Sequence, residues 1–84
     1  MFYVYYLKSA QKDFHYIGCT SDMDKRLVRH NRGAVRATKR FLPMKLIGHK
    51  LFDNKEEAFR FEKAVKKSYN LRQRFIAEVT NTAG

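Results

Sequence analysis

The chain has 84 residues, with 18 Lys and Arg against 8 Asp and Glu, so its formal net charge is +10 at pH 7. A chain of this length predicts one domain with one modest core, spanning residues 1–84. An apolar content of 44% excludes a disordered chain, and no apolar run approaches the roughly 20 residues of a membrane-spanning helix. Met1 leads directly into an apolar segment without the basic start of a secretion signal. The single cysteine, Cys19, excludes an internal disulfide and is typical of a small apolar position at a strand end. Together these features predict a reducing, cytoplasmic setting.

Residues 2–8 and 14–19 are rich in tyrosine and β-branched residues and flank the polar turn from Ser9 to Lys12, which predicts a β-hairpin. The loop length suggests that Leu7 pairs with Phe14, which would place Tyr5 opposite Tyr16. One face of the hairpin then carries Tyr3, Tyr5, Leu7, Phe14, Tyr16 and Gly18.

A helix is predicted to begin at Ser21, which would act as the N-cap before the acidic residues Asp22 and Asp24, and to end at Gly33. Its apolar stripe consists of Met23, Leu27 and His30, with Arg26 along the border. Residues 34–44 are then predicted to form a basic loop.

Lys45 to Phe52 is predicted to form a short third strand at a sheet edge, and Asn54 to cap a long helix that ends near Tyr69. The buried face of that helix should carry Ala58, Phe61, Val65 and Tyr69. Leu71, Phe75 and Val79 indicate a final short helix over the core. The order β-β-α-β-α-α predicts an α+β fold, in which helices flank a small three-stranded antiparallel sheet.

Basic residues dominate the middle of the chain, since nine Lys and Arg and no acidic residue lie between Lys25 and Phe52. Such an excess favours a polyanionic partner, and nucleic acid is the expected one. The residues that we expect to contact its backbone are Arg29, Arg32, Arg36, Lys39, Arg40 and Lys45.

Two residues break the helical patterns and leave alternatives open. Glu62 falls inside the apolar arc of the long helix, where it could pair with Lys66 four residues on or bind a metal ion in a cleft. His30 could interact with the dipole of its helix, or it could move a proton beside Arg26, which lies one turn earlier. A tyrosine can act as a base only if a cation lowers its pKa, and Arg26 or a metal held by Glu62 could supply that cation.

These positions together resemble the GIY-YIG endonuclease family, in particular its small single-domain bacterial members. Tyr16-Ile17-Gly18 is identical to the second half of the family signature, and Tyr3-Val4-Tyr5 stands where Gly-Ile-Tyr is usual. Arg26 and His30 match the motif on the first helix of the family, and Glu62 takes the place of its metal-binding glutamate. The resemblance covers residues 2 to about 67. It departs from the family at position 3, which lacks the glycine, and Asn70 comes too early to match the asparagine of many relatives.

The resemblance implies hydrolysis of a phosphodiester bond in DNA with a Mg²⁺ or Mn²⁺ ion held by Glu62. Arg26 would neutralise charge on the phosphate, and Tyr16 would position the water or the phosphate. Tyr5 is the candidate general base, with His30 relaying or accepting its proton, and His30 itself is the alternative base. The expected catalytic residues are therefore Tyr5, Tyr16, Arg26, His30 and Glu62.

The rival hypothesis is a nucleic-acid-binding module that keeps the fold without catalysis, because the charge fits that function equally well. A domain that only binds a protein explains neither the charge nor the five positions. The expected partner is DNA, with RNA as an alternative and no membrane; a targeting protein could assist, and a monomer is the default.

Overall fold

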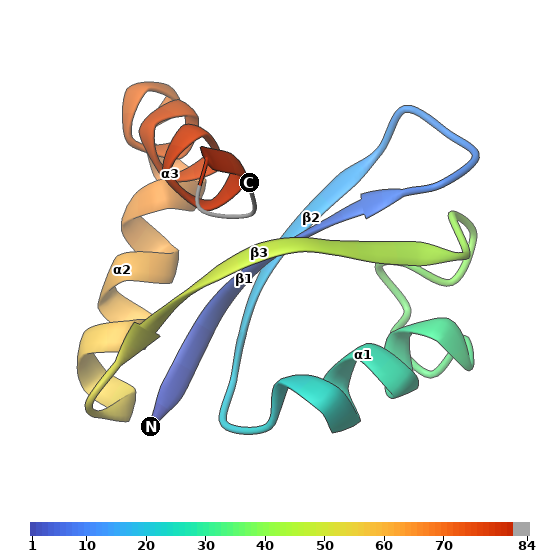
Figure 1. The fold of residues 1–84 in the computed structure, drawn as a ribbon, viewed down its shortest axis with the longest axis horizontal. Helices are drawn as coiled ribbons and strands as arrows, with labels where there is room; N and C mark the ends of the chain where they lie inside the picture. Colours follow the sequence, from blue (N-terminus) through green and yellow to red (C-terminus); the bar gives the residue numbers. More distant parts are fainter. Residues whose placement is uncertain (82–84) are drawn as a thin grey trace.

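Three antiparallel strands form the middle layer of the structure, a computed structural model that describes residues 1–81 (Figure 1). The strands are β1 (Phe2–Ser9), β2 (His15–Thr20) and β3 (Met44–Phe52), and their order in the sheet is β2-β1-β3. Helix α1 (Met23–Asn31) lies on one face of the sheet, and helices α2 (Lys55–Lys67) and α3 (Tyr69–Asn81) lie on the other (Figure 1). The predicted α+β fold, its element order and the edge position of the third strand are confirmed.

The register of the hairpin differs by two residues from the predicted one. Tyr5 pairs with Gly18 and Leu7 with Tyr16, so the expected pairing of Tyr5 with Tyr16 was wrong. The turn is wider than expected because the Ser9 hydroxyl accepts hydrogen bonds from the backbone N–H groups of residues 11 and 12, at 3.2 and 3.0 Å. Since side chains alternate with a period of two, a shift by two residues preserves the predicted faces of the hairpin.

The pairing of Tyr5 with Gly18 brings the phenol ring of Tyr5 directly over the backbone of β2. A Cβ atom at position 18 would lie 2.5 Å from Cζ of Tyr5, a distance that real Cβ atoms do not adopt. Glycine at this position therefore allows the Tyr5 ring to cross β2 toward α1, where its hydroxyl is 2.9 Å from Nε2 of His30.

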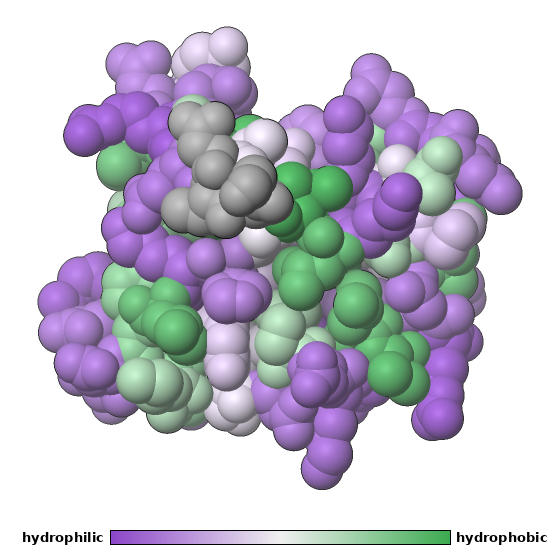
Figure 2. Space-filling view, in the orientation of Figure 1, coloured by the Kyte–Doolittle hydropathy of each residue, from purple (hydrophilic) through white to green (hydrophobic). Residues whose placement is uncertain are grey.

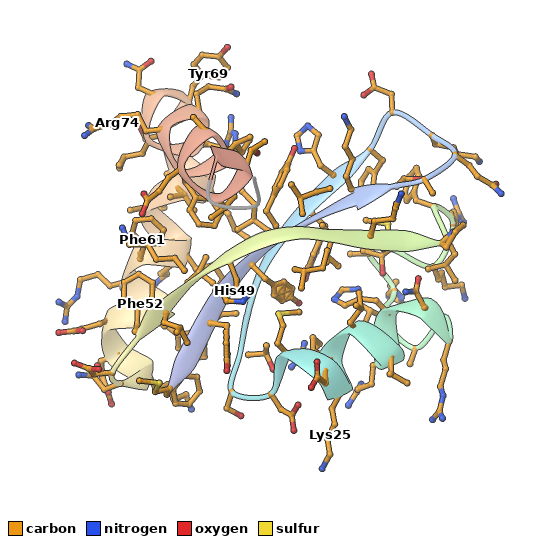
Figure 3. The ribbon with its side chains drawn as sticks, viewed as in Figure 1. Lys25, His49, Phe52, Phe61, Tyr69 and Arg74 are labelled. Carbon is orange, nitrogen blue, oxygen red and sulfur yellow. The ribbon has the colours of Figure 1, made fainter. Side chains whose placement is uncertain are left out.

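Each face of the sheet carries its own apolar cluster. On the α1 side the buried residues are Tyr5, Leu7, Met23 and Met44. On the α2 and α3 side they are Val4, Tyr6, Ile17, Ala58, Val65, Phe75 and Val79. Phe61 joins α2 to the sheet and to α3, because its ring lies 5.2 Å from that of Phe52 and 5.4 Å from that of Phe75 (Figure 3). The sheet therefore packs against α1 through one apolar cluster and against α2 and α3 through the other.

The helix ends required three corrections. Asp22, and not Ser21, caps α1, because its carboxylate accepts from the backbone N–H of Lys25 at 3.0 Å. The long helix ends at Lys67, since Ser68 is extended and its hydroxyl accepts from the backbone N–H of residue 71 in the first turn of α3. This break removes Tyr69 from the buried face, and the residue is 66% exposed (Figure 3). The last helix is also longer than expected, with 13 residues.

The basic loop between α1 and β3 is anchored at both ends. The side-chain amide of Asn31 bonds both backbone groups of Met44, at 3.1 and 2.8 Å. The Ser9 hydroxyl donates to the carbonyl oxygen of Phe41 at 2.7 Å, and the Phe41 ring stacks on that of Phe14 at 3.7 Å. The loop is therefore held against the hairpin, and its position relative to α1 is defined.

Hydrophobic side chains gather in the middle of the face shown in Figure 2, and hydrophilic ones cover its margins. No helix between residues 1 and 81 is long and apolar enough to cross a lipid bilayer.

We predict that Gly18→Ala lowers the free energy of unfolding by about 1–3 kcal/mol, because the new methyl group overlaps the Tyr5 ring. Urea denaturation of the single variant measures this loss. The control is the same change in a Tyr5→Ala background, where the overlap is absent and the cost should largely disappear. Equal costs in both backgrounds would show that the phenol ring is not what excludes a side chain at this position.

Candidate active site

Four of the five expected catalytic residues lie on the α1 side of the sheet, around the middle of β1 and β2. Tyr5 and Tyr16 come from neighbouring strands, and their ring centroids are 6.3 Å apart. His30, from the last turn of α1, lies 5.7 Å from the Tyr5 ring and 5.2 Å from the Tyr16 ring. Arg26 projects from the same helix one turn earlier, and its charge lowers the pKa of the Tyr5 phenol.

A buried chain of hydrogen bonds runs through His30. Its Nε2 atom is 2.9 Å from the Tyr5 hydroxyl, and its Nδ1 atom is 2.8 Å from the hydroxyl of Thr38 in the basic loop. Tyr5, His30 and Thr38 are all fully buried. His30 is thus more than a half-buried ring near a helix end: both of its nitrogens have defined partners that exclude water.

The pKa of the Tyr5 phenol is raised above its ordinary value, chiefly because burial disfavours the phenolate. Tyr16 and Glu62 raise this pKa further, whereas the charge of Arg26 lowers it. The expectation that Arg26 would bring the pKa of the phenol down is therefore only partly met, because burial outweighs the nearby cation. A free phenolate is consequently disfavoured in the protein alone.

The pKa of His30 is lowered from its ordinary value, first by burial and then by the charges of Arg26 and Arg29. The imidazole is therefore neutral near pH 7, and a neutral ring has one nitrogen that accepts a hydrogen bond. His30 can take a proton from Tyr5 without first losing one to solvent.

Glu62 approaches this group from the opposite layer, on α2, which packs against β1 and β2. Its carboxylate bonds Nζ of Lys66 at 2.9 Å, and its side chain is 18% exposed. The Lys66 ammonium group also lies over the Tyr16 ring, 5.7 Å from its centroid. The pairing of Glu62 with Lys66, one of the two alternatives considered from the sequence, is therefore present. Lys66 therefore connects the Glu62 carboxylate to the Tyr16 ring, and Glu62 is among the charges that raise the pKa of Tyr5.

The donor set at Glu62 limits the kind of metal that could bind. No group of three or more His, Cys, Asp or Glu side chains among residues 1–81 could hold a metal ion. A single, partly exposed carboxylate does fit Mg²⁺, which commonly keeps several waters and takes one or two carboxylates with substrate oxygens. Binding at Glu62 would have to compete with the Lys66 ammonium group.

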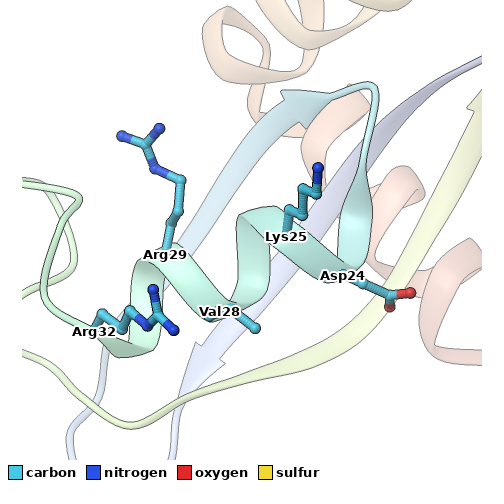
Figure 4. Close-up of a pocket in the computed structure, with 5 residues that line it drawn as sticks. All are labelled: Asp24, Lys25, Val28, Arg29 and Arg32. Carbon is cyan, nitrogen blue, oxygen red and sulfur yellow. The ribbon is translucent and has the colours of Figure 1, made fainter.

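All six residues expected to contact nucleic acid are exposed, and they lie on the last turns of α1, on the basic loop and at the start of β3: Arg29, Arg32, Arg36, Lys39, Arg40 and Lys45. A shallow groove along α1 is lined by three cations and by Asp24 and Val28 (Figure 4). A second groove lies on the loop, beside Arg36, Lys39 and Arg40. These cations therefore border the α1 side of the sheet, where the phenols lie.

Two residues that contact the site were not singled out from the sequence as parts of it. Lys66 was considered only as a partner of Glu62, yet it also lies over Tyr16. Thr38 was not identified, although its hydroxyl contacts His30 eight residues away. A threonine within a basic loop carries no local pattern that could have indicated this contact.

Comparison with known proteins agrees with this geometry. The model of the GIY-YIG catalytic domain family matches residues 1–75. A UPF0213 protein of Streptococcus pyogenes serotype M5 (strain Manfredo) is 41% identical over 66 residues, which cover 77% of this chain and 71% of the relative. A UPF0213 protein of Lactococcus lactis subsp. lactis is 40% identical over 62 residues, which cover 73% of this chain and 59% of the relative.

No solved structure matches the chain. The resemblance noted in the sequence is confirmed by the family match, which spans all three strands, α1 and α2. The chain belongs to the GIY-YIG catalytic domain family, and its relatives are UPF0213 proteins.

Proposed function

We propose that this protein is a metal-dependent endonuclease that hydrolyses phosphodiester bonds in DNA with little preference for base sequence. Membership of the GIY-YIG family supports a nuclease-type function and DNA as the substrate. The observation that carries the proposal is the buried hydrogen bond of 2.9 Å between the Tyr5 hydroxyl and Nε2 of His30. A phenol bonded to a neutral imidazole, beside a guanidinium and a carboxylate, is a group that can remove a proton from water.

The proposed proton path begins at the attacking water. As the water oxygen forms its bond to phosphorus, its proton moves to the Tyr5 oxygen, and the Tyr5 proton moves to Nε2 of His30. The bond from phosphorus to the 3′ oxygen breaks, and that oxygen takes a proton from solvent. Because both transfers are coupled, Tyr5 never has to exist as a free phenolate, which its raised pKa disfavours.

Arg26 and Tyr16 are assigned to the phosphate. Tyr5 has no exposed surface, so water reaches its hydroxyl only when a neighbouring side chain moves. Arg26 is the candidate, because a phosphate oxygen is a stronger acceptor for a guanidinium than a neutral phenol is. Its movement to the phosphate would uncover Tyr5 and neutralise charge on the nonbridging oxygens. The partly exposed Tyr16 hydroxyl would then orient the water or the phosphate.

Glu62 is assigned to the metal ion, Mg²⁺ or Mn²⁺. When bound, the ion supplies Lewis-acid stabilisation of charge on the phosphate and on the departing oxygen. The role of the protein is to present the carboxylate beside Tyr16 and to balance its charge with Lys66 until substrate binds.

One observation favours the rival function, a nucleic-acid-binding module without catalysis. The carboxylate of Glu62 is already paired with Lys66, and Tyr5 is closed to solvent, so the described state is not arranged for attack. The exposed cations of α1 and the loop would suffice for binding. Metal-dependent cleavage distinguishes the two functions.

We predict that Glu62→Gln abolishes nicking of plasmid DNA in the presence of Mg²⁺ or Mn²⁺, because the amide removes the charged ligand with little change in shape. Gel electrophoresis of supercoiled plasmid measures the loss, and excess chelator should have the same effect on the wild type. Binding of DNA should be largely retained.

The matched control is Glu57→Gln, an exposed glutamate in the first turn of the same helix, which should cut normally. Undiminished cleavage by the Glu62 variant would remove Glu62 from the metal site. Tight binding by the wild type without cleavage in any metal would establish the binding module instead.

We predict that the free energy of unfolding decreases as the pH is lowered, because His30 becomes protonated. The folded protein holds the pKa of His30 below the ordinary value of 6.5, so the unfolded chain binds more protons between these two values. The contribution is present above about pH 6.5 and is lost as the pH falls through the folded pKa. Urea denaturation at pH 7.5 and 5.0 should show a larger loss for the wild type than for His30→Gln. The titratable and charged groups that act on or contact His30 are Tyr5, Tyr16, Arg26 and Arg29. An equal loss in both proteins would contradict a neutral, buried His30.

We predict that replacing Arg36, Lys39 and Arg40 together by Gln weakens DNA binding similarly for unrelated sequences. It should also reduce the slope of log K against log salt by about 0.9 for each lost phosphate contact. Fluorescence anisotropy at several salt concentrations measures both quantities.

The control is a triple Gln variant of exposed cations on the other layer, Arg60, Lys67 and Arg74, the last of which projects away from the sheet (Figure 3). An equal change of slope in the two variants would mean that binding depends on total charge and not on the loop.

A further inference from the structure

Thr38 links the basic loop to the buried imidazole, and neither the family signature nor the sequence pattern draws attention to it. We propose that Thr38 is a positioning residue, whose hydroxyl holds the His30 proton on Nδ1 and so keeps Nε2 as the acceptor for the Tyr5 proton. This inference rests on the proposed function for its catalytic consequence. The tautomer itself is a property of the protein without substrate.

Among residues 1–81, two side chains hydrogen-bond the imidazole, and they therefore decide its tautomer. The Thr38 hydroxyl is 2.8 Å from Nδ1 and the Tyr5 hydroxyl is 2.9 Å from Nε2. All three residues have no exposed surface, so solvent cannot take the place of either partner. A neutral ring carries a single N–H, and each nitrogen must be matched by a partner of the opposite kind.

The acceptors available to the Tyr5 hydroxyl determine the direction of its hydrogen bond with His30. The Tyr5 hydroxyl hydrogen-bonds Nε2 of His30 at 2.9 Å, and the Arg26 guanidinium, whose charge lowers the pKa of the phenol, carries only donors and cannot accept the phenol proton. If Nε2 of His30 also carried a proton, the buried phenol proton would have no acceptor, because among residues 1–81 Nε2 is the one atom that hydrogen-bonds the Tyr5 hydroxyl. A buried donor without an acceptor is costly. The Tyr5 proton is therefore donated to Nε2.

The contacts of the Thr38 hydroxyl also favour a proton on Nδ1 of His30. The Thr38 hydroxyl lies 3.4 Å from the carbonyl oxygen of Val35, which can only accept. When the hydroxyl donates there, its oxygen is left to accept the proton of Nδ1. The hydrogen bonds then all run in one direction, from Tyr5 through His30 and Thr38 to the Val35 carbonyl.

Backbone contacts hold the Thr38 hydroxyl in place. The N–H of Thr38 donates to the Val35 carbonyl at 3.1 Å, and the Thr38 carbonyl accepts from the N–H of Phe41 at 2.9 Å. Phe41 is in turn fixed to the hairpin by Ser9 and by stacking on Phe14. The turn that presents Arg36, Lys39 and Arg40 to solvent therefore presents Thr38 inward.

The role of Thr38 in catalysis follows from the proton path. With the proton on Nδ1, Nε2 can accept from Tyr5, and the imidazolium that forms donates to the Thr38 oxygen. With the proton on Nε2, Tyr5 has no acceptor and the path is blocked. Loss of the hydroxyl should therefore affect turnover and not substrate binding.

The test combines the tautomer with kinetics in three variants. Thr38→Val removes the hydroxyl at nearly constant shape, Thr38→Ser keeps it, and Thr80→Val is the matched control, because Thr80 is exposed and bonds only within α3. The ¹⁵N chemical shifts of the His30 ring nitrogens report the tautomer directly in each labelled protein. Plasmid nicking with Mg²⁺ gives kcat and KM.

We expect the Nδ1–H tautomer in the wild type, Thr38→Ser and Thr80→Val. Thr38→Val should show a mixture of the two His30 tautomers. Its kcat should be lowered about 100-fold, with KM little changed. The triple Gln variant of Arg36, Lys39 and Arg40 should show the reverse, a raised KM with the tautomer intact. A wild-type spectrum with the proton on Nε2 would overturn the proposal, as would a Thr38→Val protein with the wild-type tautomer and kcat.

If Thr38→Val does not fold, the wild-type and Thr38→Ser spectra still decide the proposal, because the Nε2–H tautomer in either one contradicts it. A wild type that cuts no DNA with any metal would defeat the proposed function alone. The ring-nitrogen spectra would then still show whether Thr38 holds the proton on Nδ1.

Discussion

The arrangement of the site depends on one contact between layers, the hydrogen bond from the Tyr5 phenol in the central strand to the His30 imidazole in α1. This bond requires the aromatic ring to cross the neighbouring strand, and Gly18 is the residue that leaves room for it. The glycine of the Tyr-Ile-Gly sequence therefore has a steric explanation. It leaves room beside β2 for a phenol of the central strand, which there meets the helix that covers this face of the sheet.

Burial gives this hydrogen bond its chemical character. Both rings are removed from water, which raises the pKa of Tyr5 and lowers that of His30. The two shifts favour the neutral forms of both groups, so the pair holds one transferable proton between two neutral rings. Arg26 partly opposes the shift at Tyr5, and its departure toward a phosphate would change the electrostatics and the accessibility of the phenol together.

The site draws on both layers of the fold because β2 lies at a sheet edge. His30 of α1 contacts the Tyr16 ring from one layer, and Lys66 of α2, which pairs with Glu62, contacts it from the other. If Tyr16 lay on a central strand, the strands on both sides of it would keep the residues of the two layers apart. The cations of the basic loop lie on the α1 side, so the proposed phosphate contacts and the proton path share one layer, and the proposed metal ligand comes from the opposite one.

Local pattern in the sequence determined the order of the elements, the faces of the hairpin and the stripe of α1, since alternation, helical spacing and capping depend only on neighbouring residues. The five expected site residues came from the resemblance to the GIY-YIG family, because local pattern alone left their roles open. Tertiary structure decided which atoms meet. The width of the turn at Ser9 moved Tyr5 from Tyr16 to Gly18, the break at Ser68 exposed Tyr69, and folding of the loop brought Thr38 to His30. Contacts of this kind depend on how separate segments pack around a shared core, and no local pattern encodes that packing.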